Sequence, residues 1–159
     1  MKKYLVIGNP INHSLSPELH NHWIKQNRLD AIYEKKKLNS NDLEELILNV
    51  KKGNINGANV TVPFKNAIIP YLDELSNEAK KTRSVNTVYL KDKKVIGHNT
   101  DIEGFENAIK NIDFNLKNKK IFILGAGGVV PSIIYALIKM GSSEIMISNR
   151  TEKKGDEVK

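Results

Sequence analysis

In Ile121-Phe122-Ile123-Leu124-Gly125-Ala126-Gly127-Gly128, an apolar run leads directly into a glycine turn, and a helix is predicted over residues 129–140. Gly125 permits a tight turn, and Gly127 lets the backbone approach a pyrophosphate. The N–H groups at the start of the helix would face that anion. We therefore predict that a dinucleotide binds at Gly125, Ala126, Gly127 and Gly128; a purely structural turn is the alternative.

The end of the next strand, predicted over residues 145–148, indicates which dinucleotide is bound. An enzyme that uses NAD usually has Asp or Glu there, to hold the ribose 2′-hydroxyl. Here the sequence is Asn149-Arg150-Thr151, followed by Lys153 and Lys154. A guanidinium can grip a 2′-phosphate, which a carboxylate would repel. We predict NADP as the cofactor, with the Arg150 guanidinium at its 2′-phosphate; an ordinary basic loop is the alternative.

Strand-like and helix-like segments also alternate before the glycine turn. Strands are predicted over residues 4–7, 32–38, 56–62, 85–90 and 94–97, and helices over residues 16–27, 41–51, 68–81 and 102–112. The alternation indicates an α/β fold with a mainly parallel sheet, and the two strands around Asp92-Lys93 suggest a hairpin.

The polar segment 113–120 marks the predicted domain boundary. Residues 1–112 would form a substrate-binding catalytic domain, and residues 113–159 would begin a Rossmann-type NADP-binding domain. A dinucleotide fold needs a third strand in its first half and a second half after it. We therefore expect the second domain to be incomplete and the sequence to be a fragment or a truncated product.

Lys65 and Asp101 are candidates for the chemistry, because each follows a strand-like segment. Neighbouring strand ends in an open parallel sheet meet at one crevice. A nearby Asp favours the charged form of a lysine, and a protonated lysine suits proton donation to an alkoxide as hydride reaches a carbonyl. A surface salt bridge is the alternative.

Small polar side chains at other strand ends suggest a polyol or carboxylate substrate. The candidates are Ser14, Ser16, Thr61 and Asn86. Each also has a plain structural role; Ser16, for example, could cap the helix predicted over residues 16–27. The 4 histidines match no metal-ligand spacing, so we predict no metal site.

The composition bounds the remaining function classes. The chain has 159 residues, no cysteine and a net charge of +7. Without cysteine, disulfides and thiolate chemistry are excluded, which fits a cytoplasmic protein. No apolar segment is long enough to span a membrane. Basic segments with interleaved aromatic residues are absent, so the charge favours anionic small molecules over nucleic acid, and a homodimer remains open.

Taken together, the motifs closely resemble those of the shikimate dehydrogenase family over the whole chain. They are Ser14-Leu15-Ser16-Pro17 with His20-Asn21, Asn59-Val60-Thr61-Val62-Pro63-Phe64-Lys65, Val85-Asn86-Thr87, Asn99-Thr100-Asp101-Ile102-Glu103-Gly104, Gly125-Ala126-Gly127-Gly128 and Asn149-Arg150-Thr151. The chain departs from the family at Arg83-Ser84 and at Val129-Val130-Pro131-Ser132, and family members continue well beyond residue 159.

The resemblance implies reversible, NADP-dependent reduction of 3-dehydroshikimate to shikimate in aromatic amino-acid biosynthesis. It implies a catalytic pair of Lys65 and Asp101. Ser14 and Ser16 would bind the substrate carboxylate, while Thr61 and Asn86, with the catalytic pair, would contact the ring hydroxyls. By the same resemblance, the adenosine 2′-phosphate would be held by Asn149, Arg150 and Thr151, with Lys154 in support. Quinate as the substrate, a binding fragment without turnover, and a basic nucleic-acid-binding protein are the alternatives.

Overall fold

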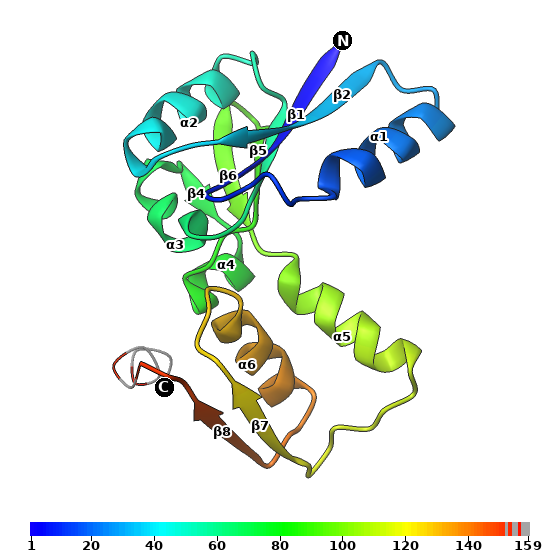
Figure 1. The fold of residues 1–159 in the computed structure, drawn as a ribbon, viewed down its shortest axis with the longest axis vertical. Coiled ribbons are helices and arrows are strands. Elements are labelled where there is room, and N and C mark those ends of the chain that lie inside the picture. Colours follow the sequence, from blue (N-terminus) through cyan, green and yellow to red (C-terminus); the bar gives the residue numbers. More distant parts are fainter. Residues whose placement is uncertain (152, 154–155, 157–159) are drawn as a thin grey trace. The chain divides into compact units, whose positions relative to one another are not determined.

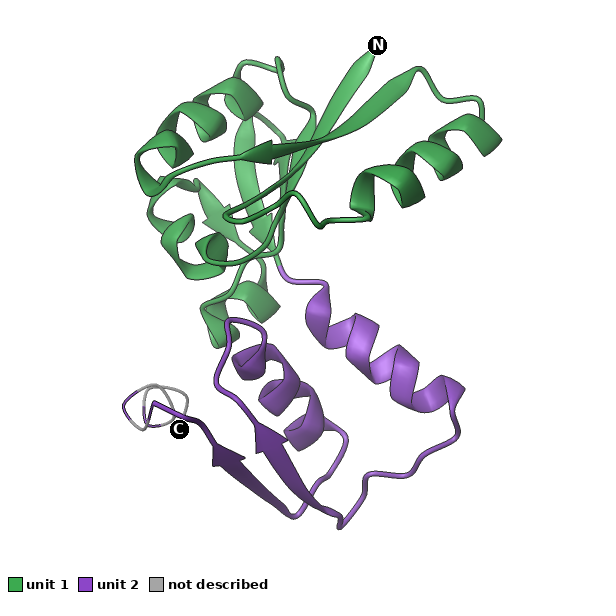
Figure 2. Cartoon of the chain, in the orientation of Figure 1, with its two compact units in different colours: residues 1–98 green, residues 99–159 purple. Residues whose placement is uncertain are grey.

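A computed structural model describes residues 1–151, 153 and 156, which form an α/β protein (Figure 1). In chain order, with η for 3-10 helices, the elements are β1 (Lys2–Gly8), α1 (Ser16–Gln26), β2 (Ala31–Lys37), η1 (Ser40–Asp42), α2 (Leu43–Lys51), β3 (Gly57–Val60), α3 (Phe64–Ala67), η2 (Ile69–Tyr71), β4 (Glu74–Leu75), α4 (Asn77–Thr82), β5 (Thr87–Lys91), β6 (Lys94–His98), α5 (Asp101–Asn111), β7 (Lys120–Leu124), α6 (Val130–Lys139) and β8 (Glu144–Ser148). Figure 2 separates two compact units, residues 1–98 and residues 99–159.

Unit 1 is built on one sheet with strand order β2-β1-β3-β5-β6-β4. Strand β1 runs parallel to β2 and β3, and β4 runs parallel to β6. Strand β5 is antiparallel to both of its neighbours. The predicted hairpin is confirmed: Asp92 and Lys93 have φ of 50° and 63°, as a two-residue hairpin turn with left-handed residues requires. The sheet is therefore mainly parallel, with one reversed strand.

Alternate residues of the strands pack on opposite faces of this sheet, since side chains of a strand alternate in direction. Leu5 belongs to the larger core, together with Leu46 and Val50 of α2. Val6 belongs to a smaller cluster with Tyr33, against which Ile24 of α1 packs. The two helices thus cover different faces of one sheet.

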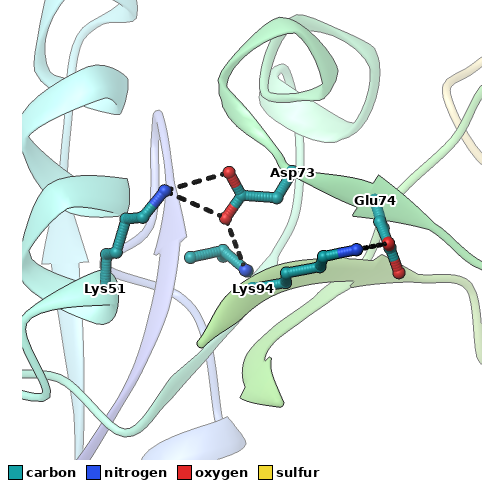
Figure 3. Close-up of polar contacts among 5 residues, drawn as sticks. Lys51, Asp73, Glu74 and Lys94 are labelled. Atoms are coloured by element: carbon teal, nitrogen blue, oxygen red, sulfur yellow. Dashed lines mark hydrogen bonds and ion pairs between the residues drawn. The ribbon is translucent and has the colours of Figure 1, made fainter. Parts of the chain in front are cut away.

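An acidic residue ties the β4 edge of the sheet to α2 (Figure 3). Asp73 accepts a 2.7 Å hydrogen bond from Val95 N and a 3.0 Å bond from Lys51 Nζ. The backbone hydrogen bond from Val95, followed by that from Lys51, lowers the pKa of the Asp73 carboxyl. Lys94 pairs with Glu74 beside it. The short strand β4, which the sequence pattern does not predict, is held in this region.

Unit 2 contains the predicted strand–turn–helix–strand arrangement. Strands β7 and β8 pair in parallel, and helix α6 connects them. The side chains alternate between half-buried and exposed along both strands, and the exposed set includes Phe122, Leu124 and Met146. One face of this two-stranded sheet is therefore left uncovered within the described part of unit 2.

The division between the units lies at residue 99, whereas the sequence places it at residue 113. Helix α5 belongs to unit 2 because it packs against α6. Glu106 of α5 is 7% exposed, and Lys139 Nζ of α6 donates a 3.0 Å hydrogen bond to its Oε2. The polar segment before β7 is therefore a connection inside unit 2. No helix among the described residues is both long and apolar enough to cross a membrane.

Candidate active site

Asn86 lies at the edge of the unit 1 sheet where β3 and β6 end and β5 begins. Strands β3 and β6 run in the same direction, and β5 runs the opposite way between them. Val60 N donates a 2.8 Å hydrogen bond to the Asn86 carbonyl, and Asn86 N donates a 3.0 Å bond to the His98 carbonyl. The backbone of Asn86 is thus fixed to both neighbouring strands.

Thr61 and Lys65 follow β3 at the same edge. Thr61 N donates to the Ile7 carbonyl at 3.0 Å, and its own carbonyl accepts from Phe64 N at 2.9 Å. Phe64 is 1% exposed and anchors the short helix α3, which contains Lys65, in the core. The Lys65 carbonyl accepts a 2.8 Å hydrogen bond from Val85 N, beside Asn86. The structure therefore brings these predicted substrate residues to one end of the sheet.

Ser14 and Ser16 lie where the loop after β1 enters α1. Ser16 N donates a 3.3 Å hydrogen bond to Ser14 Oγ, and both side chains are half-buried. The prediction that Ser16 caps the helix is wrong: Leu15 occupies the cap position, and Ser16 is already helical. The loop is joined to the Thr61 segment, since Asn9 N donates to the Val62 carbonyl at 3.0 Å.

Asp101 opens helix α5 in unit 2. Its backbone N–H donates a 2.9 Å hydrogen bond to Asn99 Oδ1, and Asn99 Nδ2 donates a 2.7 Å bond to Ser132 Oγ in α6. The sequence pattern does not reveal this support, although Asn99 begins the Asn99-Thr100-Asp101 motif. Lys65 and Asp101 belong to different units, so their pairing stays a prediction.

The glycine turn lies between β7 and α6. Gly125 has a φ of +105°, which side-chain-bearing residues rarely adopt, and its N–H donates to the Ser148 carbonyl at 2.7 Å. A Cβ added at Gly127 or Gly128 would meet no atom within 4 Å. These two glycines leave open space along the backbone, which fits the approach of a pyrophosphate.

The end of β8 meets this turn. Ala126 N donates a 3.2 Å hydrogen bond to Asn149 Oδ1, and Asn149 Nδ2 donates to the Thr151 carbonyl at 2.7 Å. Arg150 and Thr151 are exposed. Lys154, the remaining predicted 2′-phosphate residue, lies outside the described residues. Asn149 therefore connects the glycine turn to the segment that we expect to bind the 2′-phosphate.

A chain of side-chain hydrogen bonds reaches Asn86 across the sheet. Tyr33 Oη donates to Asn59 Oδ1 at 2.6 Å, and Asn59 Nδ2 donates to Thr87 Oγ1 at 3.3 Å. Thr87 Oγ1 donates to Asn86 Oδ1 at 3.0 Å. Burial raises the pKa of Tyr33 to about 12. The sequence pattern gives no role to Tyr33, Asn59 or Thr87, because their spacing along the chain gives no signal for such contacts.

Comparisons with known proteins agree with this arrangement. The family model described as the shikimate dehydrogenase substrate binding domain matches residues 6–88, just over half of the chain. A second, described as shikimate / quinate 5-dehydrogenase, matches residues 106–159. The shikimate dehydrogenase (NADP(+)) of Pelagibacter ubique strain HTCC1062 is 58% identical over 158 residues, which are 99% of this chain and 60% of that protein.

Solved structures that resemble this chain are also shikimate dehydrogenases. The crystal structure of shikimate dehydrogenase from Aquifex aeolicus has a TM-score of 0.91 and 40% identity, covering 99% of this chain and 59% of that one. The structure of the Thermus thermophilus shikimate 5-dehydrogenase with NADP(H) and shikimate has a TM-score of 0.88 and 32% identity, with coverage of 99% and 59%. The chain thus spans about 60% of the length of the Pelagibacter ubique relative. It belongs to the shikimate dehydrogenase family.

Proposed function

We propose that this chain carries the substrate-binding region and part of the cofactor-binding region of an NADP-dependent shikimate dehydrogenase. The reaction is the reversible reduction of 3-dehydroshikimate to shikimate, in the cytoplasmic synthesis of aromatic amino acids. The observation that carries the proposal is the gathering of Thr61, Lys65 and Asn86 at one end of the unit 1 sheet, held by backbone hydrogen bonds. Relatives named shikimate dehydrogenase (NADP(+)) support it.

The substrate would be held by groups of matching polarity. Ser14 and Ser16 offer hydroxyl donors to the carboxylate, and Thr61 and Asn86 offer hydrogen bonds to the ring hydroxyls. Serine at both position 14 and position 16 favours shikimate over quinate, which is the second candidate substrate.

Lys65 and Asp101 would form the catalytic pair. NADPH, when bound, supplies a hydride to the ring carbonyl carbon. The Lys65 ammonium would donate a proton to the carbonyl oxygen as negative charge develops there, and Asp101 would accept a hydrogen bond from a ring hydroxyl. In the reverse direction, Lys65 takes the proton back from the shikimate hydroxyl.

The cofactor would be held from the glycine turn. Gly125, Ala126, Gly127 and Gly128 let the backbone approach the pyrophosphate, because Gly127 and Gly128 present no side chain. Asn149, Arg150, Thr151 and Lys154 would hold the adenosine 2′-phosphate.

The alternative to an enzyme is a protein that binds shikimate but does not turn it over. It would bind shikimate through the unit 1 residues without using the cofactor contacts of unit 2. In the described part of unit 2, the exposed residues Phe122, Leu124 and Met146 leave one face of the β7–β8 sheet uncovered. A homodimer that covers this face is a further expectation, which size-exclusion chromatography with light scattering tests.

The test is shikimate-dependent NADPH formation by the 159-residue chain, with quinate in parallel and the melting temperature measured with each ligand. Turnover that is lost in Lys65→Ala but kept in the exposed Lys91→Ala would establish the enzyme. A rise in melting temperature with shikimate and no turnover would favour the binding protein. If neither turnover nor a thermal shift occurs with either ligand, the proposal fails.

A further inference from the structure

The Tyr33 relay, defined as Tyr33, Asn59, Thr87 and Asn86, joins a buried phenol to a candidate substrate residue. Tyr33 lies on β2 and Asn59 on β3, with β1 between these strands. The tyrosine side chain therefore reaches over β1 to make its 2.6 Å hydrogen bond. A shorter side chain on β2 could not span this distance, because neighbouring strands lie roughly 4.8 Å apart.

The phenol is held rigidly in place. Tyr33 is 4% exposed, and the His20 ring stacks on it with centroids 4.1 Å apart and an angle of 4° between the planes. The Asn21 amide bonds to the backbone of Tyr33 on both sides, accepting from its N–H at 2.9 Å and donating to its carbonyl at 2.8 Å. Helix α1 thus fixes the ring of Tyr33 through His20 and its backbone through Asn21.

The hydrogen bonds of the structure give each bond in the relay a direction. The Asn86 backbone carbonyl can only accept, so the Asn59 side-chain nitrogen, which donates to it at 3.4 Å, faces the Thr87 side. The Asn59 side-chain oxygen therefore faces Tyr33 and accepts from its phenol. The Thr87 hydroxyl accepts from this nitrogen and gives its own hydrogen to Asn86 Oδ1. The side-chain oxygen of Asn86 is therefore directed toward Thr87, and the side-chain NH₂ group occupies the other arm of the planar amide.

We propose that Tyr33 is a positioning residue that, through Asn59 and Thr87, sets the orientation of the Asn86 amide so that it offers N–H groups to a substrate hydroxyl. The inference rests on the proposed function, in which Asn86 contacts a ring hydroxyl of shikimate. A hydroxyl that accepts from Asn86 keeps its own hydrogen for an acceptor elsewhere. The relay would thereby make that hydroxyl the acceptor, and not the donor, in its hydrogen bond with Asn86.

The test uses Tyr33→Phe, which keeps the ring and its stacking on His20 and removes only the hydroxyl. We expect the side-chain NH₂ resonances of Asn86 in a ¹⁵N–¹H spectrum of the free chain to shift. Loss of one ordered hydrogen bond should raise the shikimate dissociation constant about 2- to 12-fold. An analogue that lacks the contacted ring hydroxyl should bind the variant and the unchanged protein equally.

Two further variants distinguish loss of the relay hydrogen bonds from a general change in side-chain packing. Tyr4 is the direct neighbour of Tyr33 in the sheet and lines the same pocket, so Tyr4→Phe is the matched control and should leave both measurements unchanged. If Tyr33→Phe does not fold, Thr87→Val breaks the relay one step later. It should shift the same Asn86 resonances, and Thr87→Ser should restore them.

The outcomes also separate this inference from the proposed function. Unchanged Asn86 resonances in Tyr33→Phe and Thr87→Val, or equal shifts in Tyr4→Phe, would overturn the relay. A chain that shows the shifts but does not bind shikimate would retain the relay as an orienting device for Asn86 and refute the shikimate assignment.

Discussion

Asn99 Nδ2 donates a 2.7 Å hydrogen bond to Ser132 Oγ, and the two side chains are 1% and 0% exposed. The other end of the Asn99 amide accepts from Asp101 N. One buried amide therefore connects the first residue of α5 to the helix that follows the glycine turn. A candidate catalytic residue and a candidate cofactor element share this support inside unit 2.

Ser132→Ala should destabilise unit 2 by about 1–3 kcal/mol, because a buried amide donor loses its acceptor. Urea denaturation, or hydrogen exchange of the α5 and α6 amides, measures the change. Ser148→Ala is the control, since its side chain is exposed in the same unit, and should change stability by less than about 0.5 kcal/mol. Equal stability of the two variants would show that the buried bond contributes nothing.

Gly125 and Gly127 should respond differently to the same substitution. Gly125→Ala places a side chain at a φ of +105° and should cost about 1–3 kcal/mol of stability. Gly127→Ala meets no atom within 4 Å, so it should leave stability nearly unchanged and weaken NADP binding. Thermal denaturation and NADP titration of both variants test this. Gly127→Ala with undiminished NADP affinity would contradict the pyrophosphate role.

Asp73→Asn should reduce stability in a pH-dependent way. The pKa of Asp73 is lower in the folded chain than the unfolded value of about 3.9. The ionised carboxylate therefore contributes stability above that unfolded pKa, and the contribution is lost as pH falls through the folded pKa. The difference between the unchanged chain and the variant should be largest near neutral pH and shrink in acid. Asp30→Asn, at an exposed position, is the control; a pH-independent difference would refute the carboxylate's role.

The sequence pattern predicts the α/β elements well where periodicity is strong. The strands and helix around the glycine turn, and the hairpin at Asp92-Lys93, have clear local signals. Strand β4 has none, because its two residues form a strand only through pairing with β6. Its flanking N–H groups, those of Asp73 and Ser76, also bond to β6 carbonyls.

The candidate site is predictable only in part, for a similar reason. Motifs next to predicted strands identify Thr61, Lys65 and Asn86. Thr61 and Lys65 follow β3, Asn86 precedes β5, and a polar residue in such a place is visible in the sequence. The supporting contacts are not visible: Tyr33 and Asn59 are 26 residues apart, and Asn99 and Ser132 are 33 residues apart. Such pairs depend on the strand order and helix packing, which the local sequence does not specify.

Arg150→Ala should weaken the binding of NADP by about tenfold or more and change the binding of NAD little, because a charge-assisted contact to the 2′-phosphate is lost. Arg150 is exposed beside the glycine turn, so the substitution should not disturb packing. Titration with adenosine 2′,5′-bisphosphate and with adenosine 5′-monophosphate isolates the same difference. Arg150→Lys keeps the charge without the planar fork and should recover part of the preference. If both nucleotides lose the same affinity, Arg150 does not read the 2′-phosphate.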